Sequence, residues 1–161
     1  MAATLRRGAW PLPNLHLCVS VEDQPRAFDR IPLLLAVPAA VRGVSYEPAL
    51  GAVHFAPYLT PYEEPLEPGE EGTVDARPRL DWIIIGGESG PGARPFDTRW
   101  AVSTIAACAR AGVACFVKQM GSRPLSLKGA PVKLKDPKGG DMSEWPTHLR
   151  VRQWPGEETS P

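Results

Sequence analysis

Apolar runs and helical spacing follow one another along the chain, which predicts strands and helices in turn. The clearest run covers residues 80–85, is dense in β-branched side chains, and stops at Gly86-Gly87-Glu88. Shorter apolar runs at residues 14–21, 40–45 and 113–117 predict three further strands. Each run is followed by polar residues, as is typical of buried parallel strands that carry polar groups at their carboxyl ends.

A first helix is expected over residues 25–37, with Pro25 in its first turn, where proline is tolerated. Pro32 fits poorly inside a single helix, so a second short helix carrying residues 33–35 is the alternative. The sequence leaves these two interpretations open.

A second helix is expected between the last two strands. Asp97 is a suitable N-cap, the helix then extends to Ala111, and Gly112 fits the position just after its end. Its inward stripe at helical spacing consists of Ala101, Thr104, Ile105, Cys108 and Ala109.

Strands that alternate with helices imply right-handed crossovers and a parallel sheet, so we predict the α/β class with parallel β/α repeats. Four such strands fit half of a TIM-barrel-like fold or a small open doubly wound sheet. A complete barrel takes roughly 250 residues, and this chain has 161. A half barrel leaves two unpaired sheet edges, which promote aggregation unless another segment covers them.

We expect a single α/β domain over residues 1–155. Residues 56–79 are rich in proline and glutamate and predict an exposed, poorly packed insertion. A second group of prolines between residues 124 and 155 predicts irregular structure that covers one face. Residues 156–161 are expected to be a disordered tail.

Composition narrows the class of protein without naming a reaction. With 43% hydrophobic and 22% charged residues, the chain is typical of a soluble globular protein. It has neither an apolar run of roughly 20 residues nor a secretory signal, so we expect a cytoplasmic protein that does not contact the membrane. The three cysteines form no C-x-x-C pair and the three histidines are scattered, which predicts small buried thiols and no metal site.

Net charge is zero, yet it is unevenly distributed. The C-terminal region from residue 115 to 155 is basic, with three acids against a larger set of bases: Lys118, Arg123, Lys128, Lys133, Lys135, Lys138, Arg150 and Arg152. Together with Trp100, Trp145 and Trp154, these bases suggest phosphate contacts and base stacking with nucleic acid. A solvated basic surface is the simpler alternative.

The strongest candidates for chemistry follow the predicted strands. Glu22, Glu47, Glu88 and Lys118 each come directly after a strand or at its end, so a parallel sheet brings them to one rim. Such a set can serve as general acid and base, or can bind a cation, an amine or hydroxyl groups. The alternative is a structural network of ion pairs.

The glycine-rich loop after residue 85 adds candidates for cofactor binding, namely Gly86, Gly87, Ser89, Gly90 and Arg94. Glycine without a side chain leaves room for a ligand close to the backbone, and Gly90 and Gly92 permit positive φ. The loop matches neither common phosphate-binding glycine pattern. A tight turn off a buried strand, with Arg94 paired to Glu88, explains the same residues.

Several blocks of the chain, in this order, resemble a known family. They are Leu17-Cys18-Val19-Ser20-Val21-Glu22-Asp23-Gln24, Val44-Ser45-Tyr46-Glu47-Pro48, Ile85-Gly86-Gly87-Glu88-Ser89-Gly90-Pro91-Gly92-Ala93-Arg94-Pro95, Phe116-Val117-Lys118-Gln119, and the tail from Asp136 to Val151. The family is the phage gp-thirty-seven/gp-sixty-eight family, a domain of unknown function also called the three-cysteine-motif proteins. The resemblance extends over about residues 10–155.

The resemblance implies an uncharacterised phage-type protein, similar to radical S-adenosylmethionine enzymes in its barrel. Family members carry a cysteine cluster motif in an N-terminal half, and this chain has no counterpart of it. The resemblance therefore implies the C-terminal half of such a barrel. S-adenosylmethionine and an iron–sulfur cluster are expected only together with a partner chain that supplies the N-terminal half. A nucleic-acid-binding module and an inactive truncated remnant are the alternatives.

Overall fold

A four-stranded parallel sheet forms the centre of the protein, for which a computed structural model describes residues 11–61 and 78–156. Its strands, in spatial order, are β1 (His16–Ser20), β2 (Val41–Tyr46), β3 (Trp82–Gly86) and β5 (Ala114–Gln119). All four strands were expected from their apolar runs, and the α/β class with a parallel sheet is confirmed.

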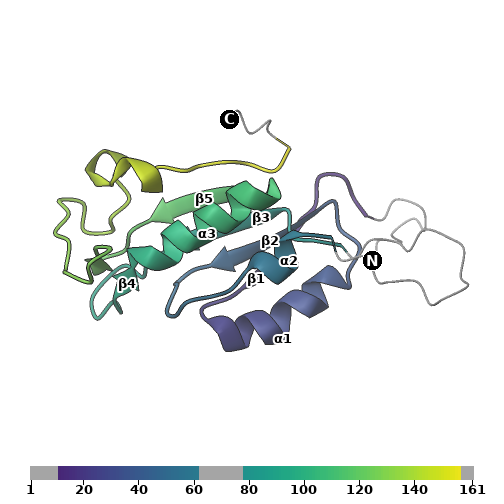
Figure 1. Ribbon diagram of the computed structural model, residues 1–161, viewed down its shortest axis with the longest axis horizontal. Helices are drawn as coiled ribbons and strands as arrows, with labels where there is room; N and C mark the ends of the chain where they lie inside the picture. Colours follow the sequence, from purple (N-terminus) through teal and green to yellow (C-terminus); the bar gives the residue numbers. More distant parts are fainter. Residues whose placement is uncertain (1–10, 62–77, 157–161) are drawn as a thin grey trace, which may run out of the picture.

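The helices lie on one face of this sheet (Figure 1). They are α1 (Gln24–Leu35), α2 (Ala56–Leu59) and α3 (Thr98–Ala111). Two-residue strands β4 (Phe96–Asp97) and β6 (Pro124–Leu125) pair in a separate small sheet that the sequence did not predict. The C-terminal segment contains two short 3-10 helices, η1 (Met142–Glu144) and η2 (Thr147–Leu149). We call the face of the four-stranded sheet opposite α1–α3 the open face.

Helix α1 is a single helix, which decides between the two open interpretations in favour of one helix that continues through Pro32. The side chain of Asp23 caps the helix by accepting from the Arg26 amide, and Pro25 lies in the first turn as expected. Pro32 is on the exposed side of α1, where solvent can reach the Phe28 carbonyl that proline leaves without a donor.

Helix α3 follows the prediction closely. Asp97 caps it by accepting from the Arg99 amide, and Gly112 ends it with a left-handed φ of 62°. Of the expected inward stripe, Ala101, Thr104 and Cys108 are buried, Ile105 is half-buried and Ala109 is exposed. Ala109 is one residue beyond Cys108, so the rotation of the helix turns it out of the core.

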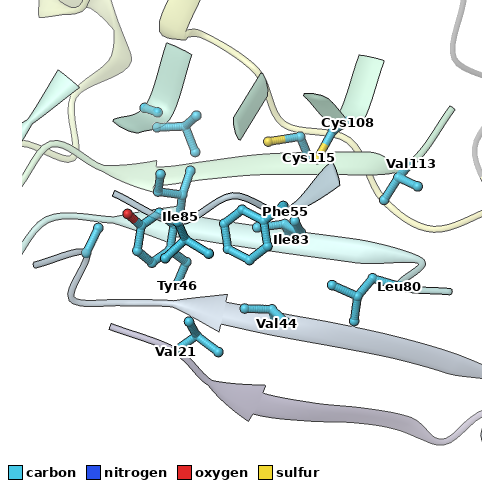
Figure 2. Packing of buried hydrophobic residues seen from close by; sticks show 14 of the residues in the cluster. Val21, Val44, Tyr46, Phe55, Leu80, Ile83, Ile85, Cys108, Val113 and Cys115 are labelled. Carbon is cyan, nitrogen blue, oxygen red and sulfur yellow. The ribbon is translucent and has the colours of Figure 1, made fainter. Parts of the chain in front are cut away.

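The hydrophobic core fills the space between the sheet and the helices (Figure 2). Val44, Ile83 and Cys115 share one row of the sheet and are at most 1% exposed. Cys108 and Cys115 behave as the small buried thiols that the sequence predicted. A mutual hydrogen bond and burial raise the pKa of Cys115. Cys18 does not follow this prediction, because it is exposed on β1.

The expected insertion at residues 56–79 is partly ordered and packed. Ala56–Leu59 form α2, with Pro57 in its first turn, where it breaks no helical hydrogen bond. Leu59 is 1% exposed and belongs to the core. The description of these residues as a poorly packed insertion was therefore wrong for α2. Residues 62–77 and the expected disordered tail at 157–161 lie outside the described residues.

The edge of β5 is covered by the C-terminal segment. Val117 donates its amide to the Val151 carbonyl, and Gln153 donates to the Cys115 carbonyl, at 2.8 and 2.9 Å. The Trp82 indole also donates to the Gln153 carbonyl. The irregular, proline-rich tail was expected to cover one face of the sheet; these contacts show it pairing with the edge of β5.

None of the helices within residues 11–61 and 78–156 has the length and apolarity needed to cross a membrane.

Candidate functional site

The closest association among the predicted rim residues joins Glu47 and Lys118. Lys118 Nζ lies 3.4 Å from Glu47 Oε2, and the Ser45 hydroxyl donates to the same oxygen at 3.4 Å. The Glu47 side chain is 16% exposed, whereas that of Lys118 is 57% exposed. Both contacts are long for hydrogen bonds, so the carboxylate keeps capacity to accept further donors.

Gly86 places the Glu47 carboxylate on the sheet. A Cβ atom at Gly86 would lie 2.5 Å from Glu47 Oε1, so any larger residue would require the Glu47 carboxylate to move. The sequence assigned Gly86 to the approach of a ligand. Instead, the space that glycine leaves beside the backbone is filled by the protein's own carboxylate.

Glu88 forms a separate, closed ion pair with Arg94. Its Oε2 accepts from the Arg94 amide and Nε, both at 2.8 Å, and its Oε1 accepts from Nη2 at 2.9 Å. These hydrogen bonds lower the pKa of Glu88 to about 2. The pairing with Arg94, one of the two roles weighed for that arginine, is present, and it satisfies both oxygens of the carboxylate.

Glu22 is also engaged within the chain. Arg30 Nη1 lies 3.2 Å from Glu22 Oε2 and donates to the Ser20 carbonyl at 2.7 Å. The pair thereby fixes α1 against the end of β1. Of the rim residues, only Glu47 and Lys118 form a direct contact with each other; Glu22 and Glu88 are each paired with an arginine. Catalytic roles for these four residues remain predictions.

Three backbone segments stack closely behind the Glu88 loop, with a glycine at each contact. A Cβ at Gly87 would lie 2.4 Å from the Met120 carbonyl oxygen, at Gly121 2.5 Å from that of Glu88, and at Gly139 2.6 Å from that of Gly121. The Met120 amide donates to the Gly139 carbonyl in the same stack. Gly87 therefore serves packing here, which was not its expected role of leaving space for a ligand.

The tip of the loop is more open. Gly90 and Gly92 have φ values of 101° and 77°, with open space beside them, which confirms their expected turn role. The Gly90 amide donates to the Ser122 hydroxyl. Ser89 is exposed. Binding of a cofactor by Ser89, Gly90 or Arg94 stays a prediction.

Sequence reasoning missed Ser122 and Gly139, which hold the loop from distant parts of the chain. Ser122 Oγ donates to the Pro137 carbonyl at 2.6 Å, and its amide donates to the Glu88 carbonyl. The glycines that follow β5, at positions 121, 139 and 140, were the sequence signal for this close packing. From the sequence alone, however, they look like ordinary turn residues, because the backbones that they contact are distant in the chain.

The open face changes character from one end of the strands to the other. Near the amino ends, Trp82 contacts the rings of Phe116 and Trp154 at 6.2 and 5.0 Å between centroids. One row further on, Ser20 and Ser45 share a register position. The Glu47–Lys118 pair follows at the carboxyl ends. An apolar floor with a polar rim is the usual arrangement of a ligand site in parallel α/β proteins.

The arginines of the basic C-terminal region make internal contacts, whereas its lysines at 128, 133, 135 and 138 are exposed. Arg150 donates to the Trp145 and Ser143 carbonyls, and Arg152 to those of Val117 and Lys118. Trp145 is 2% exposed, so its ring is not available for stacking on a base. These contacts give the nucleic-acid hypothesis no support.

No set of three or more His, Cys, Asp or Glu side chains within the described ranges is arranged to hold a metal ion. Cys18 is exposed on β1, whereas Cys108 on α3 and Cys115 on β5 are buried. The cysteines of this part of the chain therefore do not fit an iron–sulfur cluster, which needs several thiolates around one space.

Comparison with known proteins gives one match. A family model described as "Protein of unknown function (DUF5131)" matches residues 1–151. No curated protein and no solved structure matches the chain.

Proposed function

The chain belongs to the DUF5131 family of proteins of unknown function, and we propose that it supplies a polar strand-end site to a larger β/α barrel. In this proposal the chain is the C-terminal half of a phage-type, radical-S-adenosylmethionine-like barrel. The strands follow in sequence order, with α1, α2 and α3 on one face (Figure 1). That arrangement supports a barrel portion over a doubly wound sheet, which has helices on both faces.

The observation that carries the proposal is the Glu47–Lys118 pair on the open face. Glu47 Oε1 accepts no hydrogen bond from the described residues, and Lys118 contacts the carboxylate only at 3.4 Å. The carboxylate can therefore accept a proton or a hydrogen bond from a bound amine or hydroxyl group. Lys118 stabilises the negative charge and can donate to an acceptor on the same ligand.

The other rim residues hold this site in place. Arg30 with Glu22 and Arg94 with Glu88 order the loops after β1 and β3. The described residues do not fit an iron–sulfur cluster, so the chemistry proposed for Glu47 and Lys118 does not involve one. In this proposal the cluster cysteines belong to the N-terminal half-barrel chain.

The test is calorimetric titration of S-adenosylmethionine into this chain co-purified with the polypeptide encoded directly upstream. We expect binding to require both chains and to weaken at least tenfold in Glu47→Gln and Lys118→Met. Lys128→Met, which removes a lysine charge outside the rim, is the matched control and should bind as the wild type does. Unchanged affinity in Glu47→Gln, or no binding by the two chains together, would overturn the proposal.

A further inference from the structure

The outer edge of β1 carries unpaired backbone groups. No described residue pairs with β1 on the side away from β2. Val21 donates its amide to Ser45 of β2, so the alternation of a parallel ladder directs the backbone groups of Cys18 and Ser20 outward. The Ser20 carbonyl accepts from Arg30. The remaining outward groups are a template for another strand.

The hydrophobic side chains at this edge are incompletely buried. Leu17 and Val19 point to the helix side of β1 and are only half-buried. The register partner of Val19 on β2, Val44, and Ile83 next to it on β3 are both 0% exposed. One more strand with a covering helix would bury β1 as the inner strands are buried.

Helix α1 exposes apolar side chains next to the open edge of β1. Leu33 is 70% exposed, and Val37, four positions later and just beyond the helix, is 40% exposed. Leu33 lies on the same flank of α1 as Arg30, which donates to the Ser20 carbonyl. Phe28 is 64% exposed but lies about 140° around the helix from Leu33, on the flank beside an apolar hollow of about 480 Å³ between α1 and α2. Isolated exposed apolar residues are common, but an exposed pair beside an open strand edge indicates an interface.

We propose that the β1 edge and the outward face of α1 together dock a β/α unit of a separate chain. Its strand adds to the sheet parallel to β1, and its amphipathic helix packs on Leu33 and Val37. The parallel direction rests on the proposed function, because only a parallel strand ends beside Glu22 and Glu47 and extends the polar rim.

A second copy of this chain fits this surface less well. The edge of β5 is occupied by Val151 and Gln153, so two copies cannot close a barrel by joining β5 of one to β1 of the other. Two copies could pair only β1 with β1, related by a twofold axis and therefore antiparallel. That pairing points the two polar rims in opposite directions and completes neither.

The test uses the full chain and the polypeptide encoded directly upstream, measured by hydrogen–deuterium exchange and by the affinity of the pair. We expect slower exchange in β1 and α1 on mixing, with the amides that pair β5 with the C-terminal segment unchanged. The double variant Leu33→Glu, Val37→Glu should bind at least tenfold more weakly. Leu127→Glu is the matched control, since Leu127 is also exposed (48%) but lies beyond β6.

Several results would overturn the docking surface: absence of a complex, wild-type affinity in the double variant, protection confined to the open face, or a homodimer protected at β1. Failure of the proposed site is distinguishable from these. A complex that forms through β1 and α1, yet binds S-adenosylmethionine independently of Glu47, would remove the site and leave the docking surface standing.

Discussion

The two edges of the sheet differ in how completely the rest of the chain covers them. On the β5 side, the segment around Val151 and Gln153 pairs with the strand edge, and glycines at 87, 121 and 139 let three backbones stack at its carboxyl end. On the β1 side, the strand edge is open within the described residues and the core residue Leu17 is half-buried. We infer that the first side determines whether the chain folds, and the second determines what it binds.

Apart from a charged control in the core, the largest effect is expected from Gly87→Ala on the β5 side. The new Cβ would meet the Met120 carbonyl oxygen at 2.4 Å and Phe96 Cβ at 2.8 Å. Because backbone and a core residue must both shift, we expect a loss of about 3 kcal/mol in the free energy of unfolding, measured by urea denaturation. Gly90→Ala is the matched control. It meets no atom within 4 Å but has a φ of 101°, so its cost should be about 1–2 kcal/mol. Equal losses would contradict the stacked arrangement.

Trp82→Phe should have the next largest effect. The phenyl ring keeps part of the aromatic packing but loses the hydrogen bond from the indole nitrogen to the Gln153 carbonyl, which is 3.0 Å long. We expect a loss of about 1–2 kcal/mol and faster exchange of the Gln153 amide. Trp100→Phe removes the same atoms from a half-buried ring on α3 and should leave the Gln153 amide unchanged. An unchanged rate in Trp82→Phe would show that this contact does not hold the segment.

Substitutions on the β1 side should be nearly neutral in the isolated chain. Phe28→Glu and Leu33→Glu replace side chains that are 64% and 70% exposed, so each should change the free energy of unfolding by less than about 0.5 kcal/mol. Ile31→Glu, at a neighbouring position that is 0% exposed, should prevent folding. If Phe28→Glu or Leu33→Glu were as damaging as Ile31→Glu, these side chains would be part of the chain's own core.

The smallest effect on stability is expected at the Glu88–Arg94 pair, which is exposed to solvent. The pKa of Glu88 is lowered from 4.5 to about 2. A lowered pKa in the folded state means that the contribution of the pair is complete above pH 4.5 and is lost as the pH falls through about 2. NMR titration of the Glu88 carboxyl carbon should show this pKa, and Arg94→Gln should raise it toward 4.5. A wild-type value near 4.5 would show that the pair does not form in solution.

Much of the architecture could be predicted from local sequence. Apolar runs predicted the strands of the sheet, and helical spacing with Asp97 and Gly112 as caps predicted helix α3. The remaining differences have specific causes. Pro32 left open a break in the first helix, and Pro57 fell in a segment expected to be poorly packed, but one lies on a solvent-facing side and the other in a first turn. Proline interrupts a helix only where the chain cannot satisfy or expose the affected backbone groups.

The rim residues could be listed from the sequence, but their partners could not. Parallel strands place Glu47 and Lys118 at the same end, although the two are 71 positions apart in the chain. From the sequence, Gly86 and Gly87 were expected to leave room for a ligand beside the backbone. In the structure, that room is filled by Glu47 and by the backbone at Met120. Both reach these glycines only through the tertiary fold.

Amide exchange of the isolated chain, resolved by NMR, tests the difference between the two edges most directly. The Val117 and Gln153 amides donate to carbonyls across the β5 edge, whereas those of Cys18 and Ser20 point away from β2. We predict slow exchange for Val117 and Gln153, and exchange of Cys18 and Ser20 at least a hundredfold faster. Protection of Cys18 and Ser20 equal to that of Val117 would contradict the account, because it would mean that the β1 edge is already paired.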